Sequence, residues 1–322
     1  MVERFEAMLA ARYGVKHAVS VNSCTAALHL ALKAHGIGPG DEVIVPALTF
    51  VSTALAVVYC GARPVFADVD PETLCIDMLD VAKNHGRRAK MVIPVDYAGF
   101  PANDPATFCF YRKTIQDAAH SCGGLAYGDA VCLSFHPVKN LATGDGGAVL
   151  TNDDAIAERI RALRWCGIDR STWQRTGKRY AWDYSIESVG YKCHWNDLQA
   201  SVALVQLDRL DEMQARRRQI AARYTSELAG LLQTPLDHPA HTWHLYPVRV
   251  DADRRDAILD HLGNRGIGAG VHYQPLTYYA PFAGETPPVT EREWHRLISL
   301  PMYADMTDEA QEQVIAALWE VL

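Results

Sequence analysis

The chain has 322 residues, of which 49% are hydrophobic, and a formal net charge of −7. This length is enough for one large domain and a smaller one, and the negative charge gives no electrostatic reason to expect nucleic acid as a partner. The eight cysteines form no C-x-x-C pair, which argues against a zinc site and indicates reduced thiols. Neither a signal peptide nor an apolar run of membrane-spanning length is recognisable, so we expect a cytoplasmic protein without a membrane partner.

The first half of the chain alternates between apolar runs of strand length and segments with helical spacing. Helices are predicted over residues 2–13, from a cap at Asn22-Ser23 to Gly36, and over 49–59, and strands over 18–21, 42–45, 64–69 and 91–95. This alternation predicts an α/β fold with a mostly parallel sheet covered by helices on both faces. Ligands of such sheets bind beyond the carboxyl ends of the strands, and Ser23, Asp117 and Ser134 each follow a predicted strand.

The second half begins with a long predicted helix that connects a large domain, residues 1–205, to a small C-terminal α/β domain, residues 206–322. We expect Asp197 to cap this helix and an apolar stripe to run along it, with a coiled coil as the competing interpretation. The stripe consists of Leu198, Val202, Val205, Leu210 and Met213. The run Arg216-Arg217-Arg218 predicts a solvated face. The small domain is predicted to contain strands over 243–250 and 267–272 and helices over 253–262 and 307–322.

Two other features leave alternatives open. The segment from Trp165 to Tyr184 is rich in Trp, Arg and Tyr, which suits sugar stacking, a subunit interface, or a loop packed on its own core. His241, His244 and His272 lack the spacing and the acidic partners of a metal site, so no metal is expected and they are interpreted as core or substrate-contact histidines.

Lys139 is the strongest catalytic candidate in the sequence. It lies in VCLSFHPVKNLATGDGGAVLTN, residues 131–152, after an apolar strand and before a glycine-rich turn. A lysine held on such a segment can be desolvated, which lowers the pKa of its amine and makes it a usable nucleophile. This chemistry is typical of a Schiff-base lysine and indicates pyridoxal 5'-phosphate (PLP). The alternative is an exposed loop lysine.

Other stretches could supply what that cofactor needs. The Ser23 cap begins a helix whose N-terminus suits a phosphate. Asp117 ends an apolar run and, if buried, needs a cationic partner such as a pyridine nitrogen. Phe50 could lie flat on the cofactor ring. The alternatives are an ordinary helix cap for Ser23, a helix N-cap for Asp117 and a core side chain for Phe50.

Several stretches, in order and over nearly the whole chain, resemble the blocks of the DegT/DnrJ/EryC1/StrS family, which are PLP-dependent sugar aminotransferases of fold type I. They are NSCTAALHLAL, GIGPGDEVIVPALTFVSTA, GARPVFADVDPETL, IQDAAHS, GDAVCLSFHPVKNLATGDGGAVLTND, VGYKCHWNDLQASVALVQLDRLDE, RGIGAGVHYQPL and LISLPMY. The blocks around Lys139 and Asp117 are the most specific.

The resemblance implies roles for single residues. Lys139 matches the lysine that links to PLP and moves protons, Asp117 matches the partner of the pyridine nitrogen, and Phe50 matches the aromatic residue stacked on the ring. Ser23, Cys24, Thr25 and Ser134 match the phosphate site.

Further matches concern the rim of the site. His120 matches a position beside the cofactor, and His272 and Tyr273 match a segment near the sugar. Lys192 matches a residue that reaches the phosphate of the neighbouring subunit, so the resemblance implies a homodimer with shared active sites.

The resemblance also implies that a nucleotide-linked keto sugar is converted to an amino sugar with glutamate as donor. Three departures from the family pattern stand out. Cys24 replaces the usual Gly, the chain lacks the family's usual N-terminal segment, and the stretch between Tyr97 and Asp129 is shorter. One alternative is an aminocyclitol transaminase or other PLP enzyme on the same scaffold, and the missing segment and shorter stretch leave open a non-catalytic binding or regulatory homologue. A sugar dehydratase is disfavoured because known dehydratases of the family lack the lysine.

Overall fold

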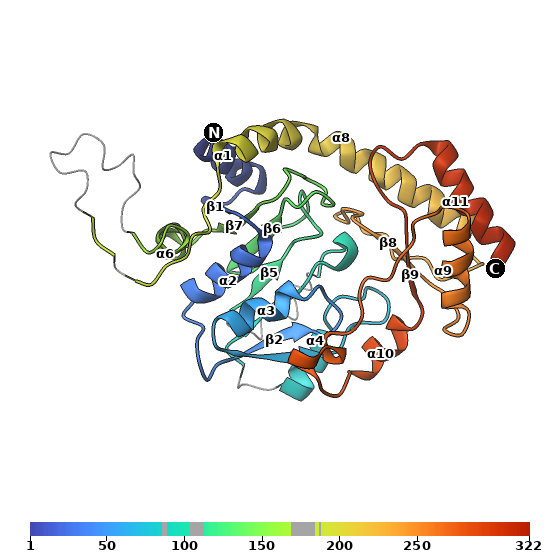
Figure 1. Ribbon diagram of the computed structural model, residues 1–322, viewed down its shortest axis with the longest axis horizontal. Coiled ribbons are helices and arrows are strands. Elements are labelled where there is room, and N and C mark those ends of the chain that lie inside the picture. Colours follow the sequence, from blue (N-terminus) through green and yellow to red (C-terminus); the bar gives the residue numbers. More distant parts are fainter. Residues whose placement is uncertain (86–88, 103–112, 169–183, 187) are drawn as a thin grey trace.

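The computed structural model describes residues 1–85, 89–102, 113–168, 184–186 and 188–322 (Figure 1). The centre of the aromatic and arginine-rich segment, residues 169–183, lies outside these ranges, as do residues 103–112 of the shortened stretch. The described helices are α1 (Val2–Tyr13), α2 (Cys24–Ala34), α3 (Ser52–Tyr59), α4 (Met78–Asp80), α6 (Asp154–Arg164), α8 (Asp197–Leu228), α9 (Arg255–Asn264), α10 (Pro288–Trp294) and α11 (Asp308–Val321). Short helical turns lie at Val81–His85, Tyr97–Gly99, Leu276–Tyr278 and Ala280–Phe282.

Seven strands of the large part of the molecule form a mixed sheet. They are β1 (His17–Val21), β2 (Glu42–Pro46), β3 (Arg63–Ala67), β4 (Met91–Val92), β5 (Ile115–Asp117), β6 (Ala130–Ser134) and β7 (Gly147–Thr151). Strands β1-β7-β6-β5 and β3-β2-β4 are joined by parallel bridges between Val92 and Thr114 and between Val95 and Asp117. Only β7 runs opposite to the other strands. The predicted mostly parallel sheet is therefore confirmed, with this one exception.

Helices cover both faces of this sheet because successive side chains of a strand point to opposite faces. In β6, Ala130 and Cys132 pack with α2, α3 and α6, whereas Val131 and Leu133 pack with α1 and α8. Figure 1 shows α2 and α3 in front of the sheet and α8 along one edge of the molecule. The two apolar layers leave the polar residues at the strand ends free to form a site.

The C-terminal part packs on the second half of α8. Strands β8 (Tyr246–Arg249) and β9 (Leu297–Leu300) pair antiparallel, and their apolar residues share a core with α8, α9 and α11. The predicted strand over 267–272 is wrong: apart from a bridge between Gly270 and Ser299, this segment runs as a loop toward the large part. The boundary predicted between residues 205 and 206 falls within α8, and the division into two domains remains a proposal.

Helix α8 departs from its predicted details in two ways. Asn196, not Asp197, is the N-cap, and its side chain accepts a hydrogen bond from the backbone N–H of Gln199 at 3.0 Å. Of the predicted stripe, Leu198, Val202 and Val205 are exposed, Met213 is partly buried and Leu210 is buried. Ala200 and Ala203, which the stripe did not include, are buried. The face of α8 that packs in the core with α1 and β6 consists of Ala200, Ala203, Leu204, Leu207 and Leu210.

Arg217 also contradicts a prediction. It is buried rather than solvated, and its Nη1 donates to the backbone carbonyls of Trp243, His244 and Met302 at 3.0, 3.3 and 3.1 Å. A buried guanidinium is tolerated when its N–H groups are satisfied in this way. Arg217 thereby ties α8 to the segment that enters β8.

Candidate active site

The predicted strand-end residues do come together. The register pairs Val21 of β1 and Ser134 of β6 with the same residue of β7, Gly147. One residue separates Ser23 from the end of β1. Asp117 is the last residue of β5, the neighbour of β6. Because β1, β5 and β6 run in the same direction, their carboxyl ends share one edge of the sheet.

The N-terminus of α2 lies at this edge and is a candidate anion site. Ser23 is its N-cap, and its Oγ accepts from the N–H of Ala26 at 3.2 Å. The N–H groups of the first helical turn have no partner within the helix and carry partial positive charge, which suits a phosphate. Thr25 Oγ1 lies 2.7 Å from Ser52 Oγ, and Ser134, at the end of β6, adds a second hydroxyl on the other side of Gly147.

Close packing fixes the N-terminus of α2 in place. A Cβ added to Gly147 would lie 2.7 Å from the backbone N of Cys24 and 2.7 Å from the carbonyl O of Leu133, so glycine is required at this point. The Cys24 side chain is buried, and its Sγ donates to the carbonyl O of Cys132 at 3.6 Å. Burial raises the pKa of this thiol well above its usual range. Cys24 is therefore a packing residue whose side chain turns toward β6.

Asp117 is a buried carboxylate with few neutral donors. Its Oδ2 accepts from Thr53 Oγ1 at 2.8 Å, and its Oδ1 accepts from the N–H of Ala119 at 3.2 Å. Burial raises the pKa of Asp117, opposed by these two hydrogen bonds and by the positive charge of Lys139. A buried carboxylate of this kind favours a cationic partner. It therefore fits the protonated ring nitrogen of a pyridine cofactor.

Lys139 lies on the loop after β6 with its amine in the same cluster. Burial lowers the pKa of Lys139 to about 8, opposed by the charges of Cys24 and Asp117. Its backbone N–H donates to the carbonyl of His136 at 2.9 Å, which closes a tight turn and directs the chain back toward β7. A lysine amine with this pKa has a substantial neutral fraction near neutral pH and can act as a nucleophile or a base.

His120 and two aromatic residues complete this cluster. His120 Nδ1 accepts from the N–H of Ala98 at 3.2 Å, so Nε2 carries the proton and donates to Tyr273 Oη at 3.1 Å. Burial, followed by the charges of Lys139 and His272, lowers the pKa of His120 well below its usual range. Phe50 is 54% exposed and lies 5.7 Å from Tyr273 between ring centroids. The alternative of a core phenylalanine is therefore wrong.

Two predicted residues lie at the edge of the cluster or away from it. His272 Nδ1 is 2.9 Å from Ser299 Oγ, and its pKa is lowered by burial and then by the charge of Lys139. Lys192 is exposed, and its Nζ lies 3.4 Å from the centroid of the Trp165 ring. Within the described residues, the Lys192 side chain packs on Trp165 and not on the Lys139 cluster of its own chain.

Sequence reasoning missed Thr53 and the contact of His244 with the lysine. His244 Nε2 is 3.5 Å from Lys139 Nζ, whereas the sequence analysis predicted a core or substrate-contact histidine. Thr53 donates to Asp117 and is itself 2.9 Å from Thr49 Oγ1. The i, i+4 spacing of Thr49 and Thr53 beside Phe50 is the signal that could have identified this pair.

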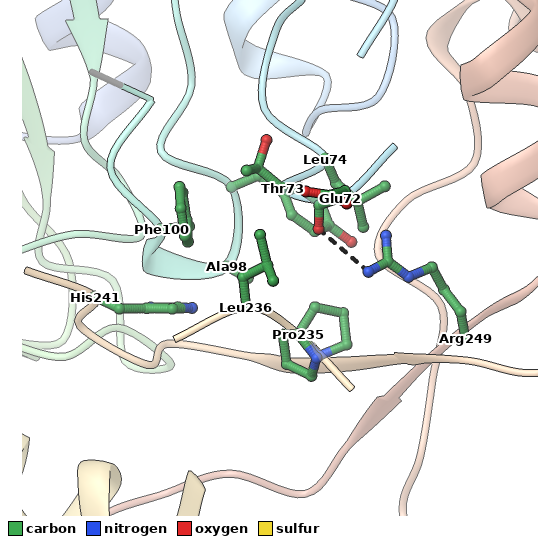
Figure 2. Close-up of a pocket in the computed structure, with 11 residues that line it drawn as sticks. Glu72, Thr73, Leu74, Ala98, Phe100, Pro235, Leu236, His241 and Arg249 are labelled. Carbon is green, nitrogen blue, oxygen red and sulfur yellow. Dashed lines mark hydrogen bonds between the residues drawn. The ribbon is translucent and has the colours of Figure 1, made fainter. Parts of the chain in front are cut away.

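A narrow pocket lies next to the cluster, and His241 is the one residue singled out in the sequence that lines it. Figure 2 shows it between the loop around Thr73, the turn at Ala98 and Phe100, and the chain at Pro235 and Leu236. Arg249 of β8 reaches across it and donates from Nη2 to the carbonyl of Glu72 at 3.2 Å. This contact joins the C-terminal part to the large part of the molecule.

The sequence is similar to a family of known aminotransferases. The sequence model of the DegT/DnrJ/EryC1/StrS aminotransferase family matches residues 1–319. The spore coat polysaccharide biosynthesis protein SpsC of Bacillus subtilis (strain 168) is 40% identical over 348 residues, covering 100% of this chain and 89% of SpsC.

Two solved structures are also similar. S. venezuelae DesV, determined in complex with a ketimine intermediate, is 36% identical with a TM-score of 0.89, covering 99% of this chain and 88% of DesV. The PLP form of the putative sugar aminotransferase Spr1654 from Streptococcus pneumoniae is 28% identical with a TM-score of 0.90, covering 100% of this chain and 92% of Spr1654. The predicted fold, that of a fold type I transferase, is confirmed, and the chain belongs to the DegT/DnrJ/EryC1/StrS aminotransferase family.

Proposed function

We propose that this chain is a PLP-dependent aminotransferase that converts a nucleotide-linked keto sugar to an amino sugar, with glutamate as the amino donor. The observation that carries the proposal is a cluster that contains the partly buried Lys139, the buried Asp117 and the N-terminus of α2. The related SpsC, DesV and Spr1654 support the class of enzyme, and the PLP form of Spr1654 supports the cofactor.

The residues of the site fit the cofactor. When bound, PLP supplies a carbonyl carbon that links to amines and a ring that accepts electrons from the substrate. The α2 N-terminus, with Ser23, Cys24 and Thr25, would hold its phosphate together with Ser134. Asp117 would pair with the ring nitrogen and keep it protonated.

Lys139 would perform the proton transfers. Its Nζ would take a proton from the substrate carbon and return it elsewhere as general base and acid, which its lowered pKa suits. Phe50 would cover one side of the cofactor ring, and His120 would hold Tyr273 in place through the Nε2 hydrogen bond. Tyr273 and His272 would face the sugar and exclude water from the reacting atoms.

The proposal includes a cytoplasmic homodimer with shared active sites. On α8, the side chains of Leu198, Val202 and Val205 are exposed, and a partner subunit would cover such an apolar surface. The exposed Lys192 would then reach the phosphate held by the partner. Within the described part of the chain, no helix is long and apolar enough to cross a membrane.

Two half-reactions test the function. Purified protein loaded with PLP is mixed with glutamate, and 2-oxoglutarate is quantified. Nucleotide-linked keto sugars that differ in the position of the keto group are then added, and the amino sugar is identified by mass spectrometry. Both products are expected from the native chain and neither from Lys139→Arg, which keeps the positive charge. An amine acceptor other than a nucleotide sugar would support the aminocyclitol alternative, and PLP binding without either product would support the non-catalytic one.

A further inference from the structure

His244 belongs to the C-terminal part of the chain, yet its ring contacts the amine of Lys139. The side chain is buried, and its Nε2 lies 3.5 Å from Lys139 Nζ across 105 residues of sequence. The ring also packs against His120 with a centroid separation of 4.5 Å. This contact is therefore a built part of the cluster and not a chance approach of two surface groups.

The neighbours of His244 determine which of its nitrogens carries the proton. The carbonyl O of Thr242 can only accept, so the group of Asn140 that faces it at 2.9 Å must be the Nδ2 amide. Asn140 therefore turns its Oδ1 toward His244 Nδ1, 3.2 Å away. Because Oδ1 can only accept, Nδ1 carries the hydrogen. The lone pair of Nε2 consequently points at Lys139 Nζ.

Burial keeps this ring neutral. It lowers the pKa of His244 well below its usual range, and interactions with His120, Lys139, Arg217 and His272 lower that pKa further. Arg217 also donates to the backbone carbonyls of Trp243 and His244, which fixes the backbone that carries the ring. A neutral imidazole with Nδ1–H can only accept a hydrogen from the lysine.

We propose that His244 is a positioning residue for Lys139: Nε2 accepts one Nζ hydrogen and holds the free amine in a single orientation, while Asn140 holds the imidazole. The inference rests on the proposed function because it assigns His244 a role toward the lysine that carries the chemistry. The benefit is kinetic. An amine with four rotatable bonds in its side chain would otherwise sample many orientations between reaction cycles.

The test uses the full-length apoprotein and measures how fast Lys139 captures added PLP. Capture is followed at the visible absorption band from pH 6 to 10, trapped with borohydride, and mapped by mass spectrometry. His244→Leu removes the acceptor at similar volume. His244→Gln restores an acceptor that reaches about as far as Nε2. Asn140→Ala releases the imidazole ring without changing the lysine, and it replaces His244→Leu in the test if that variant does not fold.

In His244→Leu we expect the limiting capture rate at high pH to fall about tenfold, the size of one net hydrogen bond. The capture midpoint should move below the native value of about 8, because a buried ammonium loses an acceptor. His244→Gln should return the rate to within about threefold of native, and Asn140→Ala should resemble His244→Leu. All variants retain the other titratable groups around the amine, namely Cys24, Asp117, His120, Arg217, His272 and Tyr273.

The outcomes separate this inference from the proposed function. If the native adduct maps to Lys139 but His244→Leu keeps the native rate and midpoint, the positioning role is wrong and the function stands. Equal losses in the Leu and Gln variants with an unmoved midpoint would indicate a purely structural histidine and would also overturn it. A native adduct on another lysine would overturn the lysine assignment and this inference together.

Discussion

Replacing Asp117 with asparagine removes the buried charge of the site with little change in shape. The amide can be accommodated: its oxygen can accept from the N–H of Ala119, and its NH2 can donate to Thr53 Oγ1, which can donate onward to Thr49 Oγ1. We therefore expect Asp117→Asn to fold, and its effect to report the charge alone.

The magnitude follows from the burial of the carboxylate. Breaking a buried ion pair by removing one partner costs about 3–5 kcal/mol, so the glutamate half-reaction should slow roughly 100- to 5,000-fold. Stopped-flow measurement of 2-oxoglutarate formation tests this. Removing the charge should also lower the pKa of Lys139 below its native value of about 8, since Asp117 raises that pKa.

A matched control separates this effect from any loss of a carboxylate. Asp129 is exposed and accepts from the N–H of Thr114 at 2.7 Å, at the opposite end of β5. Asp129→Asn should leave the half-reaction within about twofold of native. If Asp117→Asn also stays within about tenfold while remaining folded, the pairing of this carboxylate with the cofactor ring is refuted.

Three further predictions concern the amine and the packing. Since the pKa of Lys139 is lowered to about 8, its neutral form should be about 9% populated at pH 7, roughly 300-fold more than for an ordinary lysine. The rate at which the apoprotein captures PLP should therefore rise with pH through 8. A midpoint of this rise above about 9.5 would contradict the lowered pKa. Arg217→Met should lower the free energy of unfolding, measured in urea, by about 3 kcal/mol because three carbonyls lose a charged donor. Arg218 is exposed, and Arg218→Met should lower the free energy of unfolding by less than about 1 kcal/mol. Similar values for the two variants would contradict the role of Arg217. Gly147→Ala should lower the free energy of unfolding by about 1–3 kcal/mol and weaken PLP binding in a titration, because the new Cβ would lie 2.7 Å from the Cys24 nitrogen. Gly38→Ala, whose Cβ would meet nothing within 4 Å, is the control. Equal PLP affinities of the two variants would oppose the role of the α2 N-terminus.

The strand-end residues could be predicted from sequence because the information is local. Ser23, Asp117 and Ser134 each follow a short apolar run, and parallel strands bring their carboxyl ends to one edge whatever the details of packing. Lys139 was predictable for the same reason, as it follows β6 and precedes the glycine turn. The roles themselves came from the resemblance to a family.

Contacts between distant segments could not be predicted. His244 reaches Lys139 only because the C-terminal part folds back along α8, and nothing near His244 in the sequence records this. The long helix shows the same limit: Leu198 is apolar but exposed, while Ala200 is buried. Arg217 sits in a charged run yet is buried, because three backbone carbonyls of other segments surround it.

The most direct test of the account is the identity of the lysine that binds PLP. The visible spectrum of the purified protein is recorded before and after borohydride reduction, and the adduct is located by peptide mass spectrometry. The account predicts a visible band that reduction abolishes and a single adduct on Lys139, absent from Lys139→Arg. An adduct on any other lysine, or no band after PLP is added, would contradict the assignment of Lys139 and of the site built around it.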